Sequence, residues 1–308
     1  MNRNLTDDND DFTLANALDA IILMHRDAHF GGNFAFMLDY YEKEGKGVHP
    51  EIELSRILEL QQMENELKQN LAAVILTAPE AERVAAAKMA YKKLRDLYEI
   101  KHAKTVKVTH PLLIADLILS EEEEPEAEIA AVVAEKGEIV SQLIGLLRSE
   151  DFYDPLFPGY GQAPFLASKC LGLIGDKRAI IALFELIGEE DFFSETQLLE
   201  ALKQIGDPAK EFLLKVLHSR PVNLDNERAA IALAYFKDDP EVASTCFKML
   251  TELDLNAQPI FATYLVLACE GLNETEREAF IALMNAPKTP KMLKQDMQII
   301  AKQWKEIH

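Results

Sequence analysis

The stretch that decides the fold is Ala167–Ile187, ASKCLGLIGDKRAIIALFELI. Its apolar residues recur every three or four positions on both sides of a short Gly-Asp turn. This spacing predicts two amphipathic helices joined by a very tight connection. A single helix pair cannot bury both apolar stripes by itself, so we expect each pair to stack against neighbouring helices.

Related turns follow at nearly regular intervals toward the C-terminus. The turn residues Asp176, Asp207, Asp239 and Asn273 are separated by 31, 32 and 34 residues. A period of this size is typical of stacked helical repeats. The sequence therefore predicts an all-α protein whose C-terminal part is an α-solenoid of helix pairs.

Each residue of the turn has a mechanical role, which is clearest in Gly206-Asp207-Pro208. Glycine can adopt the positive φ that ends the first helix. Aspartate is expected to accept hydrogen bonds from the free N–H groups of the second helix. Proline suits the first turn of that helix, where a missing N–H does no harm. We expect the same roles for Asp176 and Asp239.

Two of the repeats resemble a known family. The segments LGLIGDKRAIIALFELI and LKQIGDPAKEFLLKVL are similar to HEAT-like repeats of the phycobilin-lyase subclass, which run Leu-x-x-Ile-Gly-Asp-Pro-x-Ala-x-x-x-Leu. The resemblance covers about residues 164–281 and is weaker after Arg220. It implies a solenoid fold, which hosts many functions. It also implies an alternative function, a lyase-like enzyme or enzyme subunit that handles a bound small molecule such as a tetrapyrrole.

The N-terminal third lacks the repeat turn. Residues 1–11 are polar and acidic and are predicted to be a disordered start. Residues 12–104 are predicted to form a separate helical domain, in which helices at 51–77 and 79–102 pair as a hairpin. Residues 105–308 then form the repeat domain.

A final amphipathic helix is predicted over Met292–Trp304, with four apolar residues on one face. A stack of repeats needs its end covered. This helix is therefore expected to cap the C-terminal end of the repeats.

Composition excludes several classes of partner. The formal net charge is −20, which disfavours binding to nucleic-acid backbones or to anionic membranes. No segment approaches the roughly 20 apolar residues of a membrane span. The three cysteines are widely spaced and favour reduced thiols. A cytoplasmic protein is expected.

Charge is unevenly distributed along the chain. Residues 83–107 are mostly basic, whereas residues 121–154 are strongly acidic. A charge run is usually a solvated face. The alternative is that the two segments attract each other, within one chain or across a homodimer.

The best candidates for chemistry are His25 and His29, which would lie one helical turn apart, as in metal-binding pairs. No third ligand is evident, and Gly31-Gly32 ends the helix directly afterwards. Core or capping histidines are the favoured interpretation, and no cofactor is predicted.

The loop over residues 151–164, DFYDPLFPGYGQAP, has three prolines and two glycines and is rich in aromatic residues. Aromatic residues on a rigidly held loop are typical of recognition surfaces. The alternative is that they fold back over the apolar end of the repeats. The candidate partner-binding residues are Tyr153, Leu156, Phe157 and Tyr160. The function predicted from the sequence is a non-catalytic scaffold that binds another protein.

Overall fold

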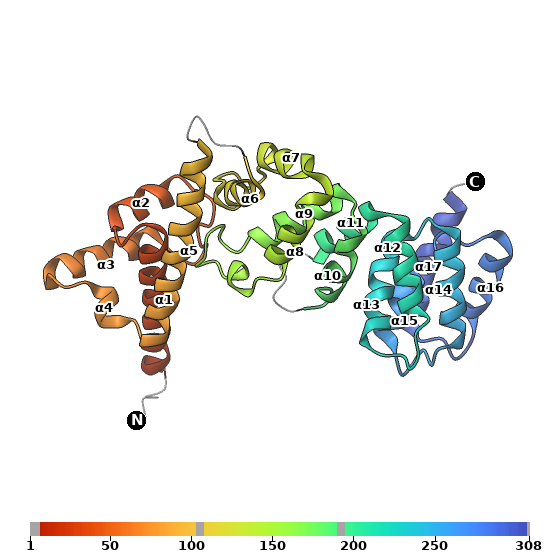
Figure 1. Cartoon of the computed structure of the whole chain (residues 1–308). Helices are drawn as coiled ribbons and strands as arrows, with labels where there is room; N and C mark the ends of the chain where they lie inside the picture. The colour runs from red at the N-terminus through yellow and green to blue at the C-terminus, as the bar shows by residue number, and fades with distance from the viewer. Residues whose placement is uncertain (1–6, 103–107, 190–194, 307–308) are drawn as a thin grey trace, which may run out of the picture. The chain divides into compact units, whose positions relative to one another are not determined.

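The structure, a computed structural model, describes residues 7–102, 108–189 and 195–306. All regular elements in these ranges are helical, as the sequence predicted (Figure 1). No helix in the described ranges is both long enough and apolar enough to cross a membrane. The chain divides into two compact units. Unit 1 comprises residues up to 135 together with 141–167, and unit 2 comprises 136–140 and 168–308.

The first half of the described chain is built from short and long helices. They are α1 (Asp7–His29), α2 (Phe34–Glu42), α3 (Leu54–Leu67), α4 (Leu71–Ile75), α5 (Ala78–His102), α6 (His110–Leu119), α7 (Glu126–Ala134) and α8 (Val140–Leu147). Residues 7–11 were predicted to be disordered but belong to α1, and residues 1–6 lie outside the described ranges.

The long helix predicted over residues 51–77 is two helices in the structure. Lys68 follows α3 with φ of 50°, in the left-handed region, and Asn70 then caps α4 by accepting from the N–H groups of Ala72 and Ala73. A left-handed residue cannot continue an α-helix. The local turn chemistry at 68–70 therefore overrides the continuous apolar periodicity.

The helix α5 packs against α1 and α6, whereas α3 packs against α2. This arrangement replaces the predicted hairpin of residues 51–77 with 79–102. The start of α5 is as predicted, because the Glu80 carboxylate accepts from both the Thr77 N–H and its hydroxyl at 2.7 Å. The apolar side chains of α6, such as Leu113 and Leu117, are buried. They make α6 part of unit 1, beyond the predicted boundary at 104.

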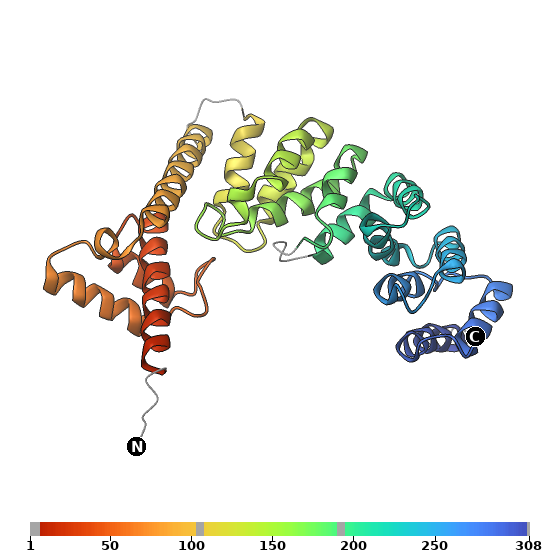
Figure 2. The ribbon, with the colours of Figure 1, turned by 90° about the horizontal axis from the view of Figure 1, so that it is seen from below.

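The second half contains α9 (Ala163–Ile174), α10 (Ile180–Glu185), α11 (Glu195–Ile205), α12 (Asp207–Leu217), α13 (Leu224–Leu233), α14 (Pro240–Glu252), α15 (Pro259–Leu267), α16 (Glu274–Asn285) and α17 (Lys291–Glu306). In unit 2, α15 contacts both α13 and α17, and α14 contacts both α12 and α16. The odd-numbered and even-numbered helices thus form two layers that pack on each other (Figure 2).

Hydrogen bonds and ion pairs join successive turns of unit 2. The Lys210 ammonium of α12 binds the Asp239 carboxylate at 2.9 Å, and the Gly271 N–H donates to the Lys237 carbonyl at 2.8 Å. The Ser244 hydroxyl of α14 donates to Glu276 of α16 at 2.5 Å. The turns near residues 207, 239 and 272 are therefore tied to one another in succession.

The predicted turn roles hold at Asp176 and Asp239 but are wrong at Asp207. Asp176 and Asp239 are N-cap residues whose side chains accept backbone N–H groups. At the second turn, Gly206 occupies the N-cap position with φ of 78°, and Asp207 is already helical. Asp207 therefore lies one residue too late to cap and instead faces Lys210 at 3.5 Å.

The last helix, α17, is amphipathic and packs its apolar face into unit 2. Leu293, Met297 and Trp304 of α17 are buried, as the sequence predicted for this face. The Trp304 indole N–H donates to the Glu270 carbonyl at 2.7 Å. The three cysteines are buried free thiols, in agreement with the sequence interpretation.

Candidate functional site

Unit 1 contains a cavity of about 370 Å³ between α1, α2, α5 and α6, which we call the aromatic cavity. Its lining residues come from these helices and from the loop before α9. They are His29, Phe30, Tyr40, Tyr91, Arg95, Tyr98, Ile118, Leu119, Ser120, Glu121, Gly159 and Tyr160. His29 and Tyr160 were predicted as candidates of two separate sites, a metal-binding pair and a partner-binding loop. The fold brings them together.

His29 is held on both ring nitrogens. Its Nε2 lies 3.1 Å from the Pro155 carbonyl, which only accepts, so Nε2 carries the proton. Its Nδ1 then accepts from the Tyr91 hydroxyl at 2.5 Å. Burial, followed by the neighbouring His25, lowers the pKa of His29 to about 2. A metal ion would have to displace one of these two hydrogen bonds to reach a ring nitrogen.

His25 lies one turn earlier on α1, with its ring centroid 4.3 Å from that of His29. Its Nδ1 pairs with the Tyr41 hydroxyl at 3.0 Å. Burial, followed by the proximity of His49, lowers the pKa of His25 to about 4. The two histidines are therefore neutral members of a packed aromatic cluster.

Tyr160 lines the cavity from a loop whose backbone has positive φ angles. Its φ is 54°, and the flanking Gly159 and Gly161 also have positive φ. The Tyr160 ring stacks on His29 with centroids 4.5 Å apart and an angle of 22°. A Cβ atom at Gly47 would lie 2.2 Å from this ring. Only glycine fits at Gly47 without a shift of the Tyr160 ring.

Tyr40 forms the polar corner of the cavity. Its hydroxyl lies 2.8 Å from the Lys46 carbonyl and 2.9 Å from the Glu121 carboxylate, so the two acceptors share one proton. The Lys46 ammonium is buried and donates to the Ser120 carbonyl at 3.0 Å. Burial is the main cause that lowers the pKa of Lys46, and nearby glutamates oppose it.

The hydroxyls of Tyr40, Tyr91 and Tyr160 stay protonated at neutral pH. Burial is the main cause that raises the pKa of Tyr40, Tyr91 and Tyr160 above the usual value for tyrosine. Acid–base catalysis works best when a group titrates near the working pH. The shifts of these tyrosines and of His29 lead away from neutrality, so this geometry suits binding more than proton transfer.

The other candidate residues of the aromatic loop lie elsewhere in unit 1. Leu156 and Phe157 are buried in a cluster with Ala28 of α1 and with Val84 and Ala87 of α5. The Tyr153 hydroxyl donates to the Leu147 carbonyl at 2.7 Å. Leu156 and Phe157 therefore serve the core of unit 1 rather than offering an exposed anchor to a partner.

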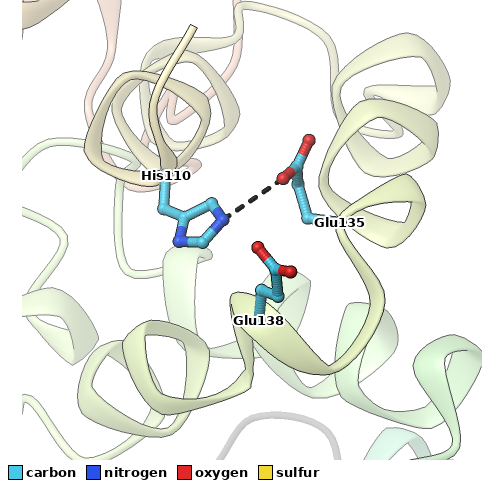
Figure 3. Close-up of side chains that lie close together, drawn as sticks. All are labelled: His110, Glu135 and Glu138. Atoms are coloured by element: carbon cyan, nitrogen blue, oxygen red, sulfur yellow. Dashed lines mark hydrogen bonds and ion pairs between the residues drawn. The ribbon is translucent and has the colours of Figure 1, made fainter.

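A further histidine, His110, pairs with Glu135 at 3.2 Å, as Figure 3 shows. These residues belong to α6 and to the C-cap of α7, both in unit 1, whereas Glu138, also drawn, belongs to unit 2. Two protein ligands are fewer than the three of a catalytic zinc site. Within unit 1, this pair ties α6 to α7.

Unit 2 has an exposed edge with repeated apolar side chains. Leu224, Ile260 and Met292 lie in the first turns of α13, α15 and α17 and are 60 %, 61 % and 79 % exposed. We call these three residues the apolar row. They are not among the candidate residues predicted from the sequence, although each lies at or next to the first residue of its helix.

The three residues lie at the same end of their helices because these helices run parallel. A cavity of about 270 Å³ is lined by both the start of α13, at Val222 and Asn223, and the start of α15, at Pro259 and Ile260. The bond from Trp304 to Glu270 places the end of α17 beside the end of α15. The beginnings of α15 and α17 therefore also lie on the same side.

Two polar groups beside the apolar row lack partners. The Gln258 Oε1 atom is buried without a hydrogen bond, and an unsatisfied acceptor of this kind is costly. Within the described ranges, the Glu227 carboxylate has no cationic partner. Both residues line the cavity between α13 and α15. This edge therefore offers a negative charge next to apolar side chains, whereas the Gln258 oxygen is buried out of reach of a partner.

Comparison with known proteins adds no relative. No protein-family model matches the sequence, and no curated protein matches it. The resemblance of residues 164–281 to HEAT-like repeats and the tetrapyrrole-handling alternative both stay predictions.

Proposed function

We propose that this chain is a non-catalytic scaffold that binds another protein through the apolar row of unit 2. The observation that carries the proposal is the repetition of large exposed apolar side chains at the start of three neighbouring parallel helices. Single exposed apolar residues are ordinary, whereas a contiguous set points to an interaction surface. Neighbouring packed helices are about 8–10 Å apart, so the row suits an extended segment of a partner.

The side chains in and beside the apolar row indicate which residues the partner segment would carry. Apolar side chains of the partner would contact Leu224, Ile260 and Met292. A lysine or arginine of the partner would pair with Glu227. The proposed ligand is therefore a protein segment with alternating apolar and basic residues.

The test is capture from the lysate of the cell that makes the protein, using the tagged intact chain. The row variant carries Leu224→Ser, Ile260→Ser and Met292→Ser. The control variant carries Leu173→Ser, Ile181→Ser and Ile299→Ser, which are 49 %, 53 % and 58 % exposed in unit 2 but lie outside the row. We expect a stoichiometric partner, identified by mass, with the wild type and the control but not with the row variant.

The charge component is tested on the same partner. Glu227→Gln should weaken its retention and should reduce the sensitivity of retention to added salt. The row and control variants each remove three exposed apolar side chains from unit 2. If both retain the same amount of the partner, the binding does not depend on the apolar row and the proposal is contradicted.

A further inference from the structure

The aromatic cavity lies in unit 1 and is not used by the proposed binding edge of unit 2. Its volume of about 370 Å³ is within the usual range of small-molecule pockets, roughly 300–1,000 Å³. Half of its lining residues carry aromatic or imidazole rings, and two of them, Arg95 and Glu121, are charged. Such a cavity is the first place to look for a bound small molecule.

The walls of the cavity suit a flat ring. Phe30 and Tyr40 have centroids 5.3 Å apart, and His29 stacks on Tyr160. Aromatic rings favour further rings in offset-stacked or edge-to-face contact. The rings of His29 and Tyr160 are fixed by hydrogen bonds, stacking and the tight fit against Gly47, so they are pre-organised for a ligand.

The cavity has one cation available. The Arg95 guanidinium lies 5.5 Å from the centroid of the Tyr91 ring. Among the described residues, no carboxylate forms an ion pair with it. A guanidinium held against a ring presents a planar fork of donors, which matches a carboxylate group. Arg95 is exposed at the rim, so a ligand can reach it without unfolding the chain.

The negative charge of Glu121 disfavours a ligand that carries more than one negative charge. Its carboxylate lines the same cavity and already accepts from the Tyr40 hydroxyl. A multiply charged anion such as a phosphate would meet this negative charge as well as Arg95, and like charges brought together are costly. A single carboxylate bound at Arg95 satisfies the cation with the least repulsion from Glu121.

We propose that the aromatic cavity of unit 1 binds a small aromatic molecule that carries one carboxylate group. The ring lies among His29, Tyr160 and the other aromatic walls, and the carboxylate pairs with Arg95. This inference does not depend on the apolar row, so either proposal can fail without the other.

The test uses the full chain and three probes, 2-naphthoate, 2-naphthamide and cyclohexanecarboxylate, with affinities measured by titration calorimetry. The amide keeps the ring and removes the charge, whereas the cyclohexane acid keeps the charge and removes the aromatic ring. We expect 2-naphthoate to bind more tightly than either of the other probes. Failure of 2-naphthoate to bind at millimolar concentration would overturn the proposal.

Two variants test which residues bind the carboxylate and which bind the ring. Arg95→Gln should weaken 2-naphthoate by about tenfold and remove its preference over 2-naphthamide, because a charge-assisted hydrogen bond is lost. Tyr160→Leu should weaken both naphthalene probes by about three- to tenfold, since it removes a stacking ring.

The matched control is Lys93→Gln, which removes one positive charge from the same helix at a position that does not line the aromatic cavity. It should leave the affinity for 2-naphthoate and the preference over 2-naphthamide unchanged. Equal losses in Arg95→Gln and Lys93→Gln would overturn the assignment of the carboxylate to Arg95.

Discussion

At the scale of single residues, the most constrained side chain is Arg26, which is completely buried in unit 1. Its guanidinium binds Asp27 at 2.6 Å, Glu64 at 2.8 Å and Asn70 at 3.2 Å. It also lies 4.4 Å from the centroid of the Phe34 ring. One cation thus joins α1 to α3 and to the N-cap of α4.

The first prediction concerns this buried arginine. Arg26→Ala should lower the free energy of unfolding by about 3 kcal/mol, because it leaves the partly buried Glu64 carboxylate without its cation and leaves Asp27 with the more distant Lys88, at 3.7 Å. Arg83→Ala is the control, since Arg83 also pairs with a carboxylate, Asp154, but its side chain is 56 % exposed. It should cost less than about 1 kcal/mol. Urea unfolding followed by circular dichroism measures both, and equal losses would contradict the role of burial.

The second prediction separates backbone strain from steric fit at two glycines. Gly31 and Gly47 both have positive φ, but a Cβ at Gly31 meets no atom within 4 Å, whereas one at Gly47 meets the Tyr160 ring. Gly31→Ala should cost about 1 kcal/mol from backbone strain alone. Gly47→Ala should cost about 1–3 kcal/mol more, because the ring must move. Thermal unfolding measures the difference, and equal costs would show that Tyr160 is not held by Gly47.

The third prediction concerns pH and His29. The unfolded chain binds a proton at the ordinary histidine pKa of about 6.5, whereas the folded chain binds it only near pKa 2. Below pH 6.5 the unfolded state therefore holds more protons, so stability falls as the pH decreases. Between pH 6 and 4.5, His29→Gln should reduce this slope by about 1.4 kcal/mol per pH unit. Urea unfolding over this range tests it. Above pH 7.5 the two slopes should coincide.

At the scale of elements, the turns of unit 2 show that an aspartate caps a helix at the N-cap position but not one residue later. Asp239 caps α14 by accepting from the N–H groups of Glu241 and Val242, and it also binds Lys210. Asp207 follows its N-cap glycine and makes no cap hydrogen bond. Two aspartates in similar Asp-Pro turns therefore contribute differently to helix stability.

The fourth prediction tests this difference. Asp239→Ala should lower the free energy of unfolding by about 1–2 kcal/mol, because it removes a cap and leaves Lys210 with weaker partners. Asp207→Ala should cost less than about 0.5 kcal/mol, since its side chain is 85 % exposed. Both are read from urea unfolding of the full chain. A cost for Asp207→Ala as large as that for Asp239→Ala would contradict the observed caps.

At the scale of the whole molecule, unit 1 is completed by a segment that returns after residue 140. Leu156 and Phe157 of this segment are buried against Ala28, Val84 and Ala87. The core of unit 1 is therefore built from parts of the chain that are far apart in sequence. A boundary placed near residue 104, as the sequence predicted, would leave out this segment as well as α6.

The fifth prediction follows from this composition of unit 1. A fragment of residues 1–167 should unfold cooperatively, whereas a fragment of residues 1–135 should have a clearly lower Tm. Each missing large apolar side chain is worth about 1.5–3 kcal/mol when buried. Circular dichroism melting of the two fragments makes the comparison. Equal Tm values would show that residues 141–167 do not complete the core.

The sequence by itself determined the helical class, most helix positions and the turns of unit 2. These features depend on local patterns, namely apolar spacing, caps and glycines with positive φ, which act within a few residues. The buried face of α17 and the caps at Asp176 and Asp239 were predicted for this reason. The predicted continuous helix at 51–77 failed where a left-handed residue, Lys68, has no strong signal in the sequence.

Only the tertiary structure decided which distant residues meet. His29 and Tyr160 were noted as separate features, but their stacking depends on how the loop before α9 returns to α1. The same return buries Leu156 and Phe157 against α1 and α5, whereas the sequence left open an exposed anchor or a cover for the end of the repeats. Apolar periodicity says that a side chain needs burial, but not against which neighbour, because burial is non-directional and many partners satisfy it equally.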